Sequence, residues 1–294
     1  MRVRFRGTRG SLPVPGEHTV RYGGNTTCIE VRSDDGGLIV LDAGTGIHAL
    51  GRELAASGRV TCHIFITHAH WDHISGLPFF LPLFVPGNHV TLCGPPDPLN
   101  MTGIEAVLAK QMEYPNFPVR TAELKADIAY RTLTEGETVD LGFAEVAAML
   151  MNHPAMDFGY KVRCDGRTLF FTGDHEPFRN IYEPGDEEWE TYEGIVRERQ
   201  GQLVDFLRGV DLFICDAQYT SEEYPSRRGW GHSTPDWALS MAREAGAGLT
   251  VLTHHDVTRT DEDLDALGAR LDAAWADTGV RFAIAREGMV LDVP

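Results

Sequence analysis

The sequence contains no long apolar run. A helix that spans a bilayer needs about 20 consecutive apolar residues, and no stretch of this chain reaches that length, so we predict no membrane span. The N-terminal segment Met1–Gly7 alternates charged and apolar residues and lacks the apolar core of a secretory signal peptide. This segment therefore predicts a strand.

Cysteine is scarce and scattered. The five cysteines are odd in number and form no C-x-x-C pair: Cys28, Cys62, Cys93, Cys164 and Cys215. This pattern excludes a disulfide framework and predicts a protein of the reducing cytoplasm. Each cysteine lies in or beside a strand-like run, so we expect small, buried apolar side chains.

Positive charge is also in short supply. The 294 residues carry a net charge of −17, with 26 basic against 43 acidic side chains. A chain this acidic lacks the broad positive surface with which proteins generally bind nucleic acids. Bound cations can nevertheless make a local pocket positive. With 43% apolar residues the chain can bury a sizeable core, and we predict a single domain over residues 1–294.

Strand-like and helix-like runs alternate in two halves. The predicted strands are Gly37–Ala43, Val60–Thr67, His89–Gly94, Glu145–Met151, Gly159–Cys164, Thr168–Thr172, Val210–Asp216, Leu249–Thr253, Arg281–Ile284 and Met289–Val293. The predicted helices are His48–Ser57, Thr102–Met112, Gln202–Arg208, Pro235–Ala245 and Asp261–Ala276. Strands in pairs, separated by helices, predict an α/β fold of two mixed sheets packed face to face with helices outside, a four-layer αββα sandwich.

One acidic stretch marked by glycine and proline stands apart from this pattern. Residues 178–198 predict either a surface insertion that acts as a lid or a plain solvated loop followed by a helix.

A dense group of imidazoles and carboxylates follows the apolar run Val60–Ile66. The motif H-x-H-x-D-H comprises His68, His70, Asp72 and His73. Imidazole and carboxylate suit Zn²⁺, Mn²⁺ and Fe. Pairs two residues apart cannot share a helix face, but a tight loop at the end of a strand can direct them at two adjacent cations. The motif predicts a metal-dependent hydrolase.

Other polar residues follow apolar strands in the same way. His153, Asp174 and His254 each end a strand-like run, so we expect them on one rim of the fold. Asp42 also follows a buried strand. It could orient a ligand histidine through that ring's other nitrogen, or cap the turn into the next helix.

In their order and number, these motifs resemble the metallo-β-lactamase-fold hydrolases. The resemblance extends from the N-terminus to His254 and implies two metal ions that share Asp174. It implies a first site of His68, His70 and His153 and a second site of Asp72, His73 and His254. His255 is the less favoured partner because His254 directly follows the strand. A hydroxide that bridges the two ions would be the nucleophile.

A further motif resembles the phosphodiesterase branch of that family. The segment Gly231–Pro235 contains His232-Ser233-Thr234, and in this branch such a histidine lies at the phosphate. Asp216 matches the acidic residue that supports it. A carboxylate-supported imidazolium can bind phosphate and protonate a leaving alkoxide. We therefore take His232, Asp216 and Asp72 as candidate catalytic residues. The glycine-rich segments 7–11 and 23–27 resemble the same branch more weakly.

The chain also departs from the tRNase Z members of that branch. Those enzymes carry a long glycine- and lysine-rich arm between the strand-end histidine and the shared aspartate, whereas here His153 and Asp174 are 21 residues apart. Cys215 stands where tRNase Z has a histidine. The motif His-Trp-Asp-His is closer to that of the small-molecule phosphodiesterases in this branch. Trp71 could stack on a base, shield the metals or simply pack beside the metal loop.

The leading hypothesis is a dinuclear phosphodiesterase that cleaves a small phosphodiester, such as a cyclic nucleotide. The alternatives are a tRNase Z-type RNA 3′-processing endonuclease, a lactone or ester hydrolase of the same fold, and a non-catalytic metal-binding regulatory domain. Zn²⁺ is the expected metal, with Mn²⁺ or Fe as alternatives. We expect a cytoplasmic protein with no membrane partner, with nucleic acid disfavoured, and we leave a homodimer open.

Overall fold

The strands form two mixed sheets. The computed structural model describes residues 1–293, and over this range each sheet has seven strands. The first sheet has the order β14 (Val290–Asp292), β1 (Arg2–Gly7), β2 (Cys28–Arg32), β3 (Leu38–Leu41), β4 (Thr61–Phe65), β5 (His89–Gly94) and β6 (Asp127–Thr132). The second has the order β13 (Phe282–Ile284), β12 (Leu249–Thr253), β11 (Leu212–Asp216), β10 (Arg167–Phe171), β9 (Phe158–Cys164), β8 (Ala144–Leu150) and β7 (Thr138–Asp140).

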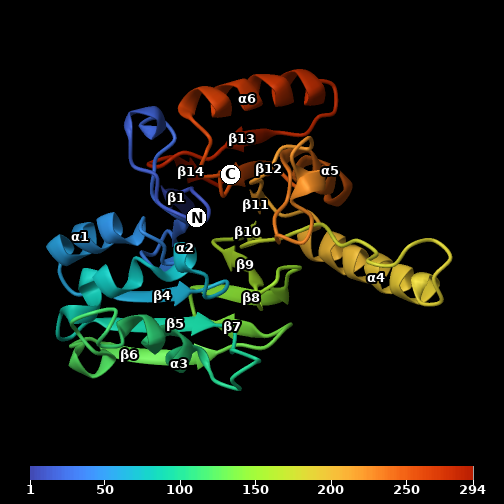
Figure 1. Ribbon diagram of the computed structural model, residues 1–294. Helices are drawn as coiled ribbons and strands as arrows, with labels where there is room; N and C mark the ends of the chain where they lie inside the picture. Colours follow the sequence, from blue (N-terminus) through green and yellow to red (C-terminus); the bar gives the residue numbers. More distant parts are fainter. Residues whose placement is uncertain (294) are drawn as a thin grey trace.

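Helices cover the outer faces of both sheets (Figure 1). Helices α1 (Ile47–Ser57) and α3 (Ile104–Ala109) contact the first sheet. Helices α5 (Pro235–Ala245) and α6 (Asp261–Trp275) contact the second, and α4 (Trp189–Leu207) packs on α5. The single-turn helix α2 (Trp71–Ile74) follows β4, and short 3₁₀ helices lie at η1 (Glu17–Thr19), η2 (Leu77–Phe79), η3 (Leu81–Phe84), η4 (Lys110–Met112), η5 (Thr121–Glu123) and η6 (Tyr224–Ser226). Among residues 1–293, no helix combines the length and the apolar character needed to cross a bilayer.

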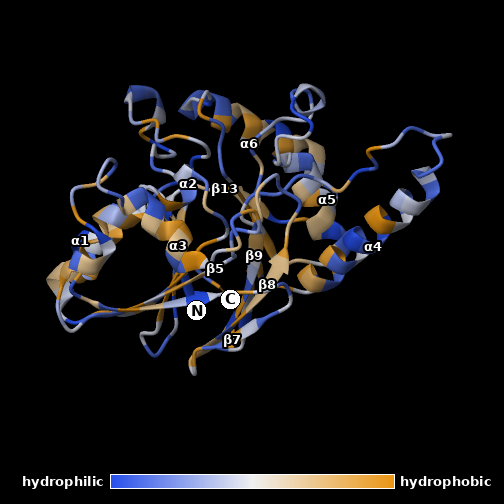
Figure 2. Ribbon diagram, turned by 60° about the horizontal axis from the view of Figure 1, so that its bottom comes forward, coloured by the Kyte–Doolittle hydropathy of each residue, from blue (hydrophilic) through white to orange (hydrophobic). Residues whose placement is uncertain are grey.

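Three hydrophobic clusters separate the four layers. On β3, Ile39 and Leu41 belong to the central cluster between the sheets, while Leu38 and Val40 face α1 in the outer cluster. This alternation is the two-residue period of a strand buried on both faces. A third cluster lies between the second sheet and helices α4 and α5. Figure 2 shows the hydrophobic colour gathered on the strands between the helices. The predicted αββα sandwich is therefore confirmed.

Strand direction brings the ends of several strands to one rim. Strands β3, β4, β5 and β6 are parallel, as are β10, β11 and β12. Strand β8 is antiparallel to β9, which is antiparallel to β10, so β8 runs in the same direction as β10. Polar residues that follow β4, β8, β10, β11 and β12 consequently meet at the carboxyl ends of the strands.

Several predicted elements need correction. Strands β2, β6 and β7 were not predicted, and α4 begins at Trp189 rather than Gln202. In β2 the pattern is obscured by Glu30, a buried carboxylate 2.6 Å from a guanidinium nitrogen of Arg6. In α4 the buried residues are Leu203, Val204 and Leu207, all near its C-terminal end, which leaves little amphipathic signal before them. All five cysteines are free and buried, as predicted.

The acidic stretch 178–198 is partly helical. Its last ten residues form the first half of α4, which extends away from the sandwich (Figure 1). A lid role for this stretch and a single-domain organisation of the chain both stay predictions.

Candidate metal centre

The predicted ligands meet at the rim in two groups that share Asp174. The first group is His68, His70, His153 and Asp174, and the second is Asp72, His73, Asp174 and His254. Within each group the ligand atoms lie within 4.8 Å of one another. All seven predicted residues are thus brought together. His68 and His70 lie in the loop after β4, whereas Asp72 and His73 lie in the single-turn helix α2.

The two carboxylate oxygens of Asp174 face different groups. Oδ2 lies 3.6 Å from Nε2 of His68 and 4.0 Å from Nε2 of His153. Oδ1 lies 3.2 Å from Nε2 of His73 and 3.0 Å from Nε2 of His254. A carboxylate with one oxygen toward each group has the geometry of a ligand shared by two cations.

The donor atoms themselves fit divalent cations. Nε2 of His68 and Oδ1 of Asp174 are buried and make no hydrogen bond. Buried polar atoms without a partner are costly and rare unless something else satisfies them. In addition, Nε2 of His73 lies 3.2 Å from Nε2 of His254, so two ring nitrogens converge on the same space. Imidazole nitrogens and carboxylate oxygens without thiolate are a donor set for Zn²⁺, Mn²⁺ or Fe.

Carboxylates behind two of the rings fix their orientation. Nδ1 of His73 donates to Oδ2 of Asp42 over 2.7 Å, and Asp42 also accepts the N–H of Thr67. Nδ1 of His68 lies 2.7 Å from Oδ2 of Asp157, which is fully buried. Each contact leaves Nε2 directed at the site, as in carboxylate–histidine–metal arrangements. The orienting alternative for Asp42 is therefore supported.

Two other rings are oriented by amide oxygens. Nδ1 of His254 lies 2.9 Å from Oε1 of Gln218, and Nδ1 of His153 lies 3.0 Å from the carbonyl oxygen of Gly231. Glu176 holds the loop of Gly231 by accepting its backbone N–H at 2.9 Å. Sequence reasoning missed Asp157, Gln218 and Glu176, because none belongs to a recognisable motif.

Burial and charge set the protonation of the rings. Burial lowers the pKa of His68 well below its ordinary value and also lowers the pKa values of His70 and His153, which favours the neutral imidazole that binds metals. Burial would also lower the pKa of His73, but the attraction of Asp174, Asp72 and Asp42 outweighs it and raises that pKa. The carboxylates thus make this pocket strongly attractive to positive charge.

The backbone is strained at the residues that directly follow β3 and β12. Asp42 has φ 62° and His254 has φ 61°, a backbone conformation that residues other than glycine rarely adopt. Such strain costs on the order of 1–3 kcal/mol per residue and gathers at functional sites. Gly173, just before Asp174, has φ 63°, and a β-carbon there would come within 2.7 Å of Asp157. Glycine is therefore required for Asp174 to enter the site.

The N-terminal loop closes over the second group. The N–H of Ser11 donates to Oδ2 of Asp72 over 2.7 Å. Gly10 lies so close to His254 that a β-carbon would be 2.4 Å from its ring. These contacts place Gly10 and Ser11 beside the second ligand group.

His232 and Asp216 form a pair next to Asp174. Nδ1 of His232 lies 3.0 Å from Oδ2 of Asp216 and 3.8 Å from Oδ2 of Asp174. Asp216 is fully buried, and its Oδ2 also accepts the N–H of Ser233. Burial would lower the pKa of His232, but the attraction of Asp216 and Asp174 outweighs it and raises that pKa to about 9. The raised pKa favours the cationic form of this ring, which lies beside the metal-ligand cluster.

The remaining sequence alternatives are also decided by position. Nε2 of His255 lies 2.8 Å from the carbonyl oxygen of Ala285 and points away from the cluster, so His254 is the member of the group. Thr234 caps α5 by accepting the N–H of Trp237, with Pro235 in the first turn. Trp71 does not pack beside the loop, since 82% of it is exposed.

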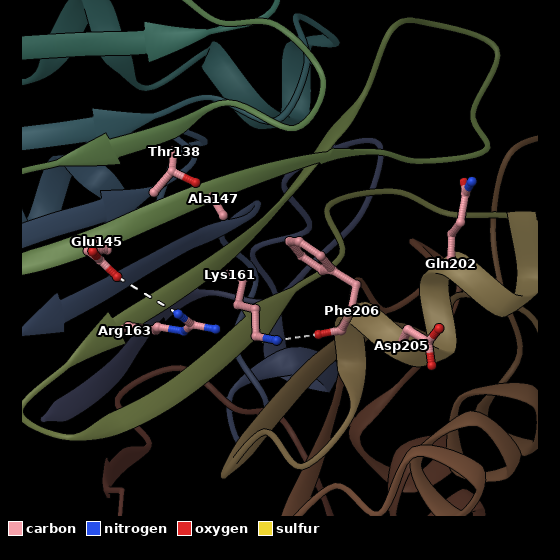
Figure 3. A pocket seen from close by; sticks show the side chains of 8 residues that line it. All are labelled: Thr138, Glu145, Ala147, Lys161, Arg163, Gln202, Asp205 and Phe206. Carbon is pink, nitrogen blue, oxygen red and sulfur yellow. Dashed lines mark hydrogen bonds and ion pairs between the residues drawn. The ribbon is translucent and has the colours of Figure 1, made fainter.

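A separate hollow lies away from the cluster on the outer face of the second sheet. It has a volume of about 470 Å³ and is bounded by β8, β9 and the end of α4 (Figure 3). Lys161 donates to the carbonyl oxygen of Phe206, and Arg163 lies 3.9 Å from Glu145. Both cationic side chains of the hollow thus have partners already. The residues that line the hollow form no group of metal ligands.

A metal-dependent hydrolase is the class that this sandwich and its histidine–aspartate rim define. The chain belongs to the beta-lactamase superfamily, because residues 38–255, most of its length, match the family model described as beta-lactamase superfamily domain. The resemblance to metallo-β-lactamase-fold hydrolases is therefore confirmed.

Relatives and solved structures are similar to this chain over nearly its whole length. Ribonuclease BN of Cronobacter sakazakii is 26% identical over 323 aligned positions, which cover 94% of this chain and 95% of the relative. Since 323 positions exceed the 294 residues of the chain, that relative has segments without a counterpart here. The metallo-beta-lactamase fold protein YhfI from Bacillus subtilis matches with a TM-score of 0.67 at 18% identity, covering 99% of each chain. A diphosphatase from the PhnP family matches with a TM-score of 0.62 at 20% identity, covering 100% of this chain and 98% of that one. At such identities the two structures show the shared fold.

Proposed function

We propose that the protein hydrolyses a small phosphodiester with the aid of two divalent metal ions. The observation that carries this proposal is the His232–Asp216 pair, whose ring nitrogen lies 3.8 Å from the shared carboxylate of Asp174. An anionic phosphate needs a cation close to the metals, and a departing alkoxide needs a proton. A supported imidazolium supplies both. Hydrolysis of a lactone or a simple ester has less need of this group.

The seven candidate ligands would hold the ions as two groups joined by Asp174. When bound, divalent ions activate a water molecule and stabilise the charge on the attacking and leaving oxygens. Zn²⁺ is the metal we favour for this set of five imidazoles and two carboxylates, with Mn²⁺ or Fe as alternatives. Asp42, Asp157 and Gln218 keep the rings oriented, while Ser11 restrains Asp72 by its backbone N–H.

His232 would act as the general acid. Asp216 holds Nδ1, so the ring's Nε2 is free to donate to a phosphate oxygen or to the leaving oxygen. Asp216 is itself fixed by the N–H groups of His175 and Ser233, at 3.2 and 3.3 Å. A proton held by this pair is therefore placed before the substrate binds, without a rearrangement of the site.

RNA 3′ processing is the second candidate, favoured by the ribonuclease relative that aligns over nearly its whole length. Against it stands the connection where the sequence lacks an arm. Between His153 and Asp174, strands β9 and β10 form a tight hairpin that turns at Asp165 and Gly166, with φ 54° and 71°. No segment there projects to hold a tRNA, and the chain's net charge of −17 opposes polyanions.

Substrate size separates these two candidates. With Zn²⁺ or Mn²⁺ bound, the protein is expected to hydrolyse bis-p-nitrophenyl phosphate and at least one 2′,3′- or 3′,5′-cyclic nucleotide. Precursor tRNA should be cleaved at least about 10²-fold less efficiently, because the electrostatic contacts that hold RNA are missing. Absorbance assays and gel assays with the same enzyme preparation give kcat/KM for each substrate. Efficient release of a tRNA 3′ trailer, with weak activity on small diesters, would reverse the order of the candidates.

The carboxylate behind His68 is expected to tune metal affinity. Asp157→Asn removes the carboxylate that orients this ligand, so the affinity for Zn²⁺ should fall about 10–100-fold. Competition with a chromophoric chelator measures the change. Asp127→Asn is the matched control, because Asp127 forms a 3.0 Å pair with His89 on the exposed surface. An unchanged affinity in Asp157→Asn would rule out this orienting role.

A further inference from the structure

A large groove opens beside the first ligand group. Its volume is about 940 Å³, and its walls are α2, the loop after β5, α3 with the segment beyond it, and the loop before β9. The lining is mainly apolar, with aromatic and proline side chains prominent: Trp71, Phe79, Pro95, Phe117, Pro154 and Met156. Pockets for organic ligands have this size and character.

The groove borders two loops of the candidate metal centre, although no candidate ligand lines it. Ala69 and Trp71 flank His70 in the sequence, and Pro154 directly follows His153. The two histidines lie 3.1 Å apart between ring nitrogens, so the groove and the first group share the same two loops. A phosphate held at the metals would therefore lie close to the groove.

The exposure of these side chains indicates a binding surface. Trp71 is 82% exposed and Phe79 is 56% exposed. Contiguous exposed apolar surface on a folded protein commonly marks a site of interaction. The rings of Phe79 and Phe117 pack edge to face, with centroids 5.3 Å apart, so this wall is already ordered.

The polar groups of the groove indicate what it recognises. Its charged lining residues, within the described chain, are Lys110 and Asp97, which pair at 3.1 Å and leave no net charge. Gln111 has a buried Nε2 without a hydrogen-bond partner. The groove thus offers flat apolar faces and no net charge, which suit an uncharged aromatic group.

We propose that the groove binds an aromatic ester group of the substrate while the phosphate lies at the candidate metals. The proposal rests on the proposed function and narrows it to aryl-bearing phosphodiesters. Trp71 and Phe79 are the specificity residues. Because Trp71 lies between His70 and Asp72, binding in the groove and at the metals uses one loop.

Binding of phosphate monoesters tests this proposal independently of catalysis, since each carries a single organic group. Methyl phosphate, phenyl phosphate and 1-naphthyl phosphate are titrated into Zn²⁺-loaded protein by calorimetry. Affinity should rise about 10–100-fold from the methyl to the naphthyl ester, as expected for the added apolar area. Trp71→Ala and Phe79→Ala should each remove at least about threefold of this gain and leave the affinity for methyl phosphate within about twofold.

Two controls keep the outcome clear. Trp189→Ala removes a tryptophan of the projecting helix α4, which does not line the groove, and should keep the full aryl preference. Metal content is measured for every variant. If Trp71→Ala loses metal, the result for Phe79→Ala, a residue outside the metal loop, decides the test. Equal affinities for the three esters, an aryl preference unchanged in both groove variants, or no binding at all would overturn the proposal. If the aryl preference is found but no phosphodiester is hydrolysed, the proposed function fails and the groove assignment stands.

Discussion

Asp174→Ala is expected to abolish activity and to leave the protein without its paired metal ions. Asp174 is the residue common to both ligand groups, and each of its oxygens faces a different pair of histidines. Its loss removes a charge from both sites at once and leaves the first group with three imidazoles and no carboxylate. Bound metal, measured by elemental analysis, should fall from two ions per chain to one or none. Hydrolysis of bis-p-nitrophenyl phosphate should fall by at least about 10³-fold, because metal ions supply several kcal/mol of transition-state stabilisation.

Asp127→Ala provides the matched control for this loss. Asp127 also lies close to a histidine, His89, but the pair is exposed and remote from the rim. Its substitution should leave metal content and rate unchanged. An Asp174→Ala protein that retained two ions and most of its activity would contradict the shared-ligand arrangement.

His232→Ala is expected to keep both metals and lower kcat by about 10²–10⁴-fold, the range for loss of a positioned acid. The loss should be smaller for a p-nitrophenyl ester than for an alkyl ester, because p-nitrophenolate departs without a proton. Asp216→Asn should give a milder form of the same pattern, since it removes the charge that supports the ring. Rates on the two leaving groups, with metal content for each variant, measure this difference.

His89→Ala is the control for removing an imidazole elsewhere, on the exposed surface. Equal losses on good and poor leaving groups would assign His232 to phosphate binding alone. No loss on any phosphodiester would leave His232 without a catalytic role and favour the lactone or ester hydrolase.

The metal centre was predictable because its ligands follow strands. His153, Asp174 and His254 each lie within three residues of the end of a strand, and parallel strands deliver their carboxyl ends to one rim. The clustered loop from His68 to His73 supplied the rest. A sequence displays this regularity without any knowledge of tertiary contacts.

The supporting residues were not predictable on the same basis. Asp157 contacts His68 from 89 positions away, and Gln218 contacts His254 from 36 positions away. Neither has a neighbour in sequence that would indicate its partner. The first pair forms when the two sheets pack, and the second forms when β11 and β12 lie side by side, so no local pattern in the sequence indicates either pair.

Strand β2 and the groove were also missed, because contacts between distant segments determine both. Strand β2 carries Glu30, a charged residue that looks like a surface residue in the sequence. In the structure its charge is balanced by Arg6 of β1, so the side chain is buried. The groove beside Trp71 is built from segments that follow β4, β5 and β8, and no single segment reveals it.

The most direct test of the central claim is a stepwise titration of metal-free protein with Zn²⁺. Bound ions per chain are measured together with the rates of hydrolysis of bis-p-nitrophenyl phosphate, a cyclic nucleotide and a lactone. A dinuclear phosphodiesterase should reach full phosphodiester hydrolysis only as the second ion binds, with little action on the lactone. Saturation of the rate at one ion, or a fully loaded protein that cleaves the lactone and leaves every phosphodiester intact, would contradict the account.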